Sequence, residues 1–242
     1  MSNFARVLSA LILALGVAAA GSFAGEALVR SRLGFRTVTV KGLAERAVRA
    51  DLAFWPMRFT ANGPTLEQAR GALEISERAV REFLVARGFS DKDSSVQNIQ
   101  VEDRMAGYNA NQTPEQYRFV LTEDMLVRTS DVDRLAAAAR DVGELLKADV
   151  VFASDNYSAG PSYLFTGLAE LKGAMLAEAT RRAREAAETF AVESGAKVGQ
   201  IQNANQGVIE IKAAVELPNE RPEKQIDKIV RVVTTLTYFL QD

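Results

Sequence analysis

Carboxylates are the side chains of this sequence best suited to chemistry. Among its 242 residues there is no histidine and no cysteine. This excludes thiol nucleophiles, histidine bases, Ser-His-Asp triads and the usual His and Cys zinc sites. Carboxylate, lysine, serine and tyrosine chemistry remain. Because no spacing in the chain is typical of a catalytic constellation, we expect no enzyme, no catalytic residues, no cofactor and no metal site.

Glu123 is the carboxylate in the least expected position. It lies on the apolar side of a strand predicted over residues 116–128, within the alternating row Tyr117, Phe119, Leu121, Met125 and Val127. Asp124 is adjacent, so it points to the opposite face and cannot act with Glu123 as a pair. Burial would raise the pKa of Glu123 and suit it to acid chemistry. An ion pair or a strand-edge position is the simpler expectation, and we favour it.

Other candidate groups have similar simple explanations. A polar segment could hydrogen-bond a glycan, although a turn and a solvated strand face explain it as well; its residues are Gln200, Gln202, Asn203, Asn205 and Gln206. Trp55 and Tyr163 could be binding platforms, but aromatic residues in amphipathic strands usually belong to the core. The glycines at 160, 167 and 173 form no phosphate loop, because no Gly-Lys-Ser/Thr follows them.

A long alanine-rich helix is predicted within residues 161–207. Thr166 can cap its first turn, and Gly195 can end it in a left-handed conformation. Its apolar stripe recurs at steps of three and four, through Leu168, Leu171, Met175, Ala179, Ala183, Ala186 and Phe190. The opposite side is charged, with Arg181, Arg182, Arg184, Glu185 and Glu188. We interpret this side as a solvated face rather than an anion site.

The other elements predict the fold class. Alternating strands begin at Thr37, with a change of apolar parity near Pro56 that suggests a bulge or an edge kink. A helix capped by Thr65 and Gln68 ends at Gly88, and a second begins around Ser130. Strands are expected at 95–105, 150–157, on both sides of a turn within 201–211, and at 230–240.

From Val48 the order is β-α-β-β-α-β, followed by α-β-β. This predicts an α+β domain: an antiparallel sheet with helices on one face in the split βαβ, ferredoxin-like order, plus a long helix and C-terminal strands.

Residues 7–25 form an uncharged, mostly apolar run of 19 residues. As a helix it would span about 28 Å, close to the hydrocarbon core of a bilayer. We therefore divide the chain into an N-terminal signal anchor or signal peptide, 1–29, and an exported domain, 30–242. Ala18 and Ala20 would suit cleavage, whereas the apolar run continues as an uncleaved anchor would. Arg30, Arg32 and Arg36 make the downstream flank basic, which by itself favours the opposite orientation.

Several motifs resemble the SIMPL-domain family of bacterial envelope proteins. The first motifs are the Thr-Val-Thr-Val-Lys-Gly opening at 37–42 and Asp51, and the last is the closing Val-Val-Thr-Thr at 232–235. Between them lies the alanine-spaced helix that leads into Ser194, Gly195 and Gly199. Its alanines are Ala174, Ala179, Ala183, Ala186 and Ala187. The resemblance, to the membrane-anchored branch in particular, implies a periplasmic location, an α+β fold and a tendency to oligomerise. It implies no catalytic residues.

Two hypotheses from different classes follow. We favour a non-enzymatic periplasmic domain that acts by self-assembly and by binding or scaffolding. A single N-terminal span would anchor it at the bacterial inner membrane, or it would be soluble in the periplasm if the signal is cleaved. The alternatives are a binder of a small ligand or peptide, and a carboxylate-based enzyme with Glu123 in a pocket. The net charge of −2 gives no basis for nucleic acid binding. The expected partners are further copies of the chain, the membrane and a protein that the sequence does not identify.

Overall fold

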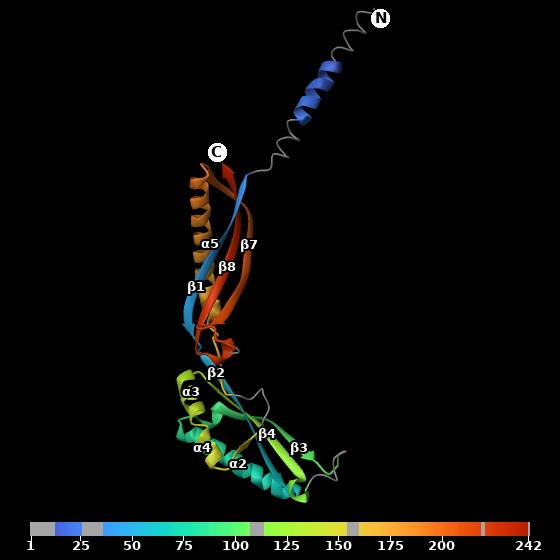
Figure 1. Ribbon diagram of the computed structural model, residues 1–242, viewed down its shortest axis with the longest axis vertical. Coiled ribbons are helices and arrows are strands. Elements are labelled where there is room, and N and C mark those ends of the chain that lie inside the picture. The colour runs from blue at the N-terminus through green and yellow to red at the C-terminus, as the bar shows by residue number, and fades with distance from the viewer. Residues whose placement is uncertain (1–12, 26–35, 107–113, 154–159, 219–220, 242) are drawn as a thin grey trace, which may run out of the picture. The chain divides into compact units, whose positions relative to one another are not determined.

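The chain folds into two compact units. The structure is a computed structural model that describes residues 13–25, 36–106, 114–153, 160–218 and 221–241 (Figure 1). The larger unit comprises Ala44–Ala177 and Val208–Val232, and the smaller unit comprises Met1–Leu43, Glu178–Gly207 and Val233–Asp242. Each has its own buried apolar cluster.

The larger unit is built on an antiparallel sheet of the order β3-β4-β2-β5. Its strands are β2 (Leu52–Gly63), β3 (Ser94–Asp103), β4 (Phe119–Thr129) and β5 (Val151–Phe152), and the short β6 (Ser162–Leu164) also pairs with β2. The helices are α2 (Leu66–Ala86), α3 (Val132–Arg140) and α4 (Gly143–Lys147). The first strand of this unit, β2, lies beside the third, β4. The helices pack on the face that carries the buried odd-numbered side chains of β2 and β4. The predicted fold class is confirmed.

Local signals in the sequence set the starts of two helices. Thr65 caps α2 as predicted, because its hydroxyl accepts the Gln68 N–H at 3.3 Å. At α3 the cap is Asp131, whose carboxylate accepts the Arg134 N–H at 3.0 Å, rather than Ser130. An ionised oxygen at this position is the stronger acceptor and also complements the helix dipole.

The expected bulge at Pro56 is wrong. In β2 the buried side chains stay on odd positions from Ala53 to Ala61, and Pro56 pairs in register with Leu126. The parity changes instead at Ala50 and Asp51, where the chain leaves β1 (Thr37–Arg49), a strand of another sheet, and enters β2. Pro56 lies between the stretches of β2 that pair with β6 and with β5, a position where the missing N–H costs little.

A second sheet has the order β1-β8-β7, with β7 at Lys197–Ala213 and β8 at Asp227–Gln241. The long helix α5 (Leu168–Glu193) lies along it (Figure 1). In the smaller unit its buried residues are Ala179, Ala183, Ala187 and Ala191. The predicted stripe holds as far as Ala183, but Phe190 is 62% exposed. Steps of four advance about 40° further than a full turn, so the buried stripe drifts around the helix as it follows a twisted sheet.

Gly42 permits the closest approach between the helix and the sheet. A Cβ placed there would overlap the carbonyl oxygen of Ala179 and lie 2.6 Å from the backbone nitrogen of Ala183. The strand therefore meets the helix backbone directly, between the small alanine side chains. This contact explains why the opening segment at 37–42 ends in glycine.

In the larger unit, the start of α5 is held by a carboxylate far away in sequence. Asp51 accepts hydrogen bonds from the Thr166 N–H at 2.8 and 3.0 Å and from the Gly167 N–H at 3.1 Å. We expected Thr166 itself to supply the cap. The tertiary cap places a negative charge at the positive end of the helix. At the other end, Gly195 has a φ of 68°, as predicted.

One continuous strand, β7, replaces the two strands and the turn expected around 201–211. Its glycines mark close approach to β8 rather than a turn. A Cβ on Gly207 would lie 2.7 Å from the Val233 carbonyl oxygen, and one on Gly199 would lie 3.0 Å from that of Phe239.

Of the predicted N-terminal segment, the structure describes residues 13–25, which are helical and expose Leu13, Leu15, Val17 and Phe23. Within the described parts of the chain, no helix is both long enough and apolar enough to cross a membrane. The remainder of 1–29 and the arginines at 30 and 32 lie outside the described residues.

Replacing Gly42 with alanine tests the close contact of the strand with α5. We expect Gly42→Ala to lower the free energy of unfolding by about 3 kcal/mol, because the new methyl group meets backbone atoms that cannot rotate away. Gly173→Ala, on the exposed side of the same helix with open space around it, should instead stabilise by about 1 kcal/mol. Urea unfolding followed by circular dichroism measures both. Equal effects of the two substitutions would contradict the contact.

Candidate functional site

Glu123 is buried in the middle of the larger sheet. It lies on β4 between Phe59 of β2 and Ile99 of β3, and its side chain is only 1% exposed. Its Oε1 atom is buried without a hydrogen-bond partner among the described residues. No ion pair of the described residues involves it, and β4 is not an edge strand. The ion-paired or strand-edge Glu123 that we favoured from the sequence is therefore wrong.

Asp124 shows the contrasting fate of a carboxylate on the opposite face. It is 3.2 Å from the Arg58 guanidinium and is partly exposed. The two adjacent carboxylates thus point away from each other, as strand geometry predicts. Glu123 has to be considered alone.

Incomplete coverage by α2 leaves a groove above Glu123. The helix packs on β2 and β4, while β3 at the edge keeps Ile99 and Val101 more than half exposed. A bulge at Gln97 contributes, since β3 pairs Val96 with Met125 and then Asn98 with Asp124. The extra residue places Val96, Ile99 and Val101 on the same face of the sheet, towards the helix.

The groove has a volume of about 760 Å³, within the range of small-molecule sites. Its apolar lining comes from both layers, the helix and the sheet, and its charged residues come mainly from α2. The lining residues are Leu66, Glu67, Arg70, Leu73, Glu74, Glu77, Ile99, Val101, Leu121 and Glu123.

The pKa of Glu123 is raised to about 7, mainly by burial and in addition by the nearby negative charge of Glu77. The positive charge of Arg81 lowers the pKa of Glu123. The Arg81 guanidinium is 2.8 Å from the Glu77 carboxylate, however, so Arg81 forms its ion pair with Glu77 and not with Glu123. Glu123 therefore changes its charge near neutral pH. It can donate a hydrogen bond below pH 7 and acts as an anion above it.

The other residues singled out in the sequence do not join this groove. Trp55 and Tyr163 are 4% and 6% exposed and belong to the core, where Trp55 meets the Phe83 ring edge-on. The polar residues from Gln200 to Gln206 lie exposed on β7, as the solvated-strand interpretation predicts, and no turn is present.

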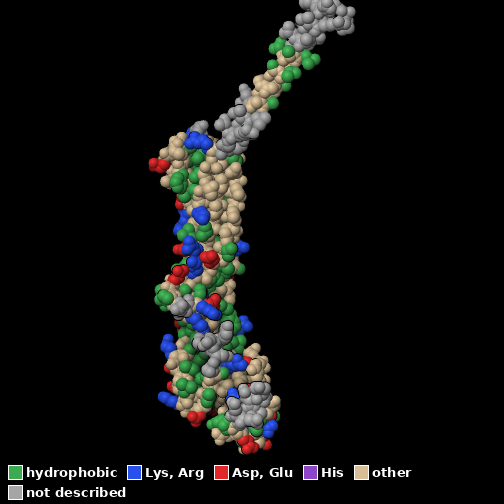
Figure 2. All heavy atoms as spheres, turned by 45° about the vertical axis from the view of Figure 1, so that its right-hand side comes forward, with side chains coloured by type: hydrophobic (Ala, Val, Ile, Leu, Met, Phe, Trp, Pro, Cys, Tyr) green, Lys and Arg blue, Asp and Glu red, His purple; other side chains and the backbone are tan. Residues whose placement is uncertain are grey.

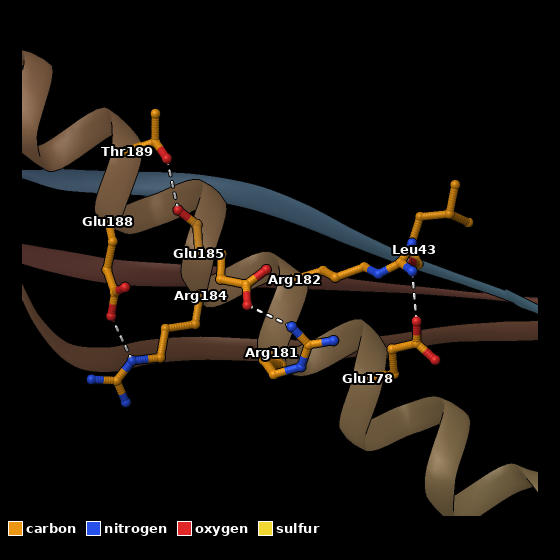
Figure 3. A network of polar contacts seen from close by, with 8 residues as sticks. All are labelled: Leu43, Glu178, Arg181, Arg182, Arg184, Glu185, Glu188 and Thr189. Atoms are coloured by element: carbon orange, nitrogen blue, oxygen red, sulfur yellow. Dashed lines mark hydrogen bonds and ion pairs between the residues drawn. The ribbon is translucent and has the colours of Figure 1, made fainter.

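The charged side of α5 is internally paired (Figure 3). Three arginines each contact a glutamate one turn away: Arg181 with Glu185 at 2.6 Å, Arg182 with Glu178 at 2.6 Å, and Arg184 with Glu188 at 2.9 Å. Arg182 also donates to the Leu43 carbonyl at 3.1 Å. Exposed pairs of this kind favour a solvated face over an anion site.

Two lysines close to Pro222 in the sequence, Lys224 and Lys228, were not predicted as binding residues. Lys224 donates to the carbonyl oxygens of Gly160 and Pro161 at 3.1 Å, and Lys228, 3% exposed, donates to that of Pro222 at 2.6 Å. Burial lowers the pKa of both ammonium groups. A spacing of four residues beside prolines was the only signal for them in the sequence. Because both ammonium groups bind backbone carbonyls, these hydrogen bonds stabilise the backbone conformation at Gly160, Pro161 and Pro222.

Metal ligands do not gather in the described part of the chain, where no group of three or more Asp or Glu side chains could hold an ion. The groove itself contains carboxylates and one guanidinium, with no hydroxyl or amine among its described lining residues. Among the described titratable residues that line the groove, Glu123 is the one that is buried.

These observations define a structural class: an α+β chain that contains a ferredoxin-like sheet with its helices, and a separate three-stranded sheet with a long alanine-rich helix. The chain belongs to the SIMPL family, whose model, described as a protein of unknown function (DUF541), matches residues 38–232. The match includes Gly42, Asp51 and the long helix, on which the resemblance rested. No curated protein matches the chain.

The pH dependence of stability tests the buried state of Glu123. In the unfolded chain the carboxyl ionises around pH 4.5, whereas in the folded chain it keeps its proton up to about pH 7. The folded state binds more protons in this window, so the contribution of Glu123 to stability falls as pH rises, by about 3 kcal/mol in total. Glu123→Gln should remove this fall, and the stability difference between variant and wild type should grow from pH 4.5 to 7.

Asp124→Asn is the matched control, because its ion-paired carboxylate lies on the other face. The stability difference between Asp124→Asn and wild type should not grow from pH 4.5 to 7. Urea unfolding at a series of pH values measures all three proteins. A constant difference between wild type and Glu123→Gln would contradict the buried, unpaired carboxylate.

Proposed function

We propose that this chain is a non-enzymatic assembly domain of the bacterial envelope. In this proposal its N-terminal segment holds it at the inner membrane, the folded part lies in the periplasm, and copies associate through β7 to form a scaffold. The apolar run at 7–25 and the resemblance to the membrane-anchored branch support the location.

The edge of β7 supports assembly. Within the described residues β7 pairs only with β8, so its other edge presents backbone N–H and C=O groups. Residues 198–209 include no charge and no proline. Figure 2 shows largely uncharged polar side chains and backbone, drawn in tan, along this part of the surface. Asparagine and glutamine in register with a second copy can form hydrogen-bonded ladders.

Two of the other edge strands, β1 and β3, carry features that discourage pairing. β1 contains Lys41, Glu45, Arg46 and Arg49, and β3 is interrupted by its bulge. Charges and bulges are the usual protection of sheet edges against association. β7 is long and lacks charges over most of its length, so it is the edge most open to a partner strand.

An enzymatic function has one observation in its favour, the pocketed Glu123 with its pKa of about 7. The described lining of the groove offers no serine, lysine or tyrosine to act with it. The described lining therefore supplies no serine, lysine or tyrosine nucleophile for catalysis at this site. We favour binding at the groove over turnover.

Light scattering of the full chain in mild detergent tests assembly. We expect a discrete oligomer that persists on tenfold dilution, and we expect Asn203→Lys/Asn205→Lys to shift it to the monomer, because two charges on each strand repel when strands pair. The matched control, Gln97→Lys/Asn98→Lys, adds the same charge to β3, the exposed edge of the other sheet. A monomeric wild type would overturn the proposal, as would an equal response to both double variants.

A further inference from the structure

We propose that the groove between α2 and β3 binds an organic cation with an apolar body, whose ammonium group reaches the carboxylate of Glu123. This proposal concerns the larger unit and does not depend on assembly through β7.

The first argument is the unsatisfied oxygen. Glu123 Oε1 is fully buried and has no hydrogen-bond partner among the described residues. An acceptor left unpaired in an apolar environment is costly, and a charged one is more costly still. The neighbours of Glu123 along the sheet, Phe59 and Ile99, have no donor to offer. A ligand that brings an N–H group removes this cost.

The second argument is the shape and lining of the site. The groove of about 760 Å³ opens beside β3, and its walls include Leu66, Ile99 and Val101, each about half exposed. Apolar side chains above a single polar group match a molecule with an alkyl or aromatic body and one polar end. Covering these side chains adds favourable burial of apolar surface.

The third argument is charge. The charged groups of α2 around the groove are Glu67, Arg70, Glu74, Glu77 and Arg81. Arg70 is 3.5 Å from Glu74, and Arg81 is 2.8 Å from Glu77, so these four charges compensate in pairs. The remaining charges are those of Glu67 and, above pH 7, Glu123. The site is therefore anionic, which favours a cation and opposes a fatty acid or a phosphate.

Calorimetric titration of the full chain with three probes that share an eight-carbon body tests the proposal. The probes are octylammonium, octanol and octanoate. At pH 8 we expect octylammonium to bind at least tenfold more tightly than either of the others. Binding should weaken about tenfold at pH 6, because the ionised fraction of a carboxyl with a pKa of about 7 falls from about nine-tenths to about one-tenth.

Glu123→Gln should abolish the preference for octylammonium and its pH dependence, while Asp124→Asn should keep both, because Asp124 lies on the opposite face of β4. Both variants retain the N-terminal segment, so any uptake of amphiphile there is common to all the proteins. A thermal unfolding curve verifies that each variant is folded. Equal affinity for octanol or octanoate, unchanged binding by Glu123→Gln, or no binding of octylammonium to the wild type would overturn the proposal.

Discussion

The direct contact between a strand backbone and a helix backbone at Gly42 is the constraint on which the smaller unit depends. A helix covered with leucine would be held about 10 Å from a sheet by its side chains. In this unit the buried positions of α5 are alanines at a four-residue step, and the facing position of β1 has no side chain. Alanine side chains bury little apolar surface. The close approach of the two backbones offsets this loss, because their atoms come within range of dispersion attraction. The arrangement tolerates no added atom at residue 42.

Coverage of the sheet determines what is available in the larger unit. In the split βαβ order the first and third strands lie at the centre, and α2 packs on these two, here β2 and β4. The edge strand β3 still has apolar side chains on the helix side, because its bulge restores their parity after Gln97. The groove is therefore the direct result of one helix covering two strands and of a third strand whose side chains face the same way.

How far the sequence predicts this structure depends on the range of the interactions involved. The β-α-β-β-α-β order from β2 to β5, the Thr65 cap, the end at Gly195 and the apolar parity of Glu123 follow from local patterns, and the structure confirms them. The burial of Ala187 and Ala191 in place of Phe190 depends on the twist of a sheet made from distant strands. The tertiary cap by Asp51 joins residues 115 apart in the chain. No periodicity in one segment contains that information.

Glu123 combines both kinds of information. Its parity was visible in the sequence, but its lack of a partner was not, because that depends on which charged residues α2 brings above it and on how they pair among themselves. A carboxylate in that position is neutral in acid and anionic above neutral pH. A bound cation would stabilise the anion and lower its pKa, so binding near pH 7 releases a proton. The affinity of the groove for a cation and the protonation of Glu123 are therefore coupled quantities, and the same unpaired oxygen that lowers the stability of the empty domain favours the occupied one.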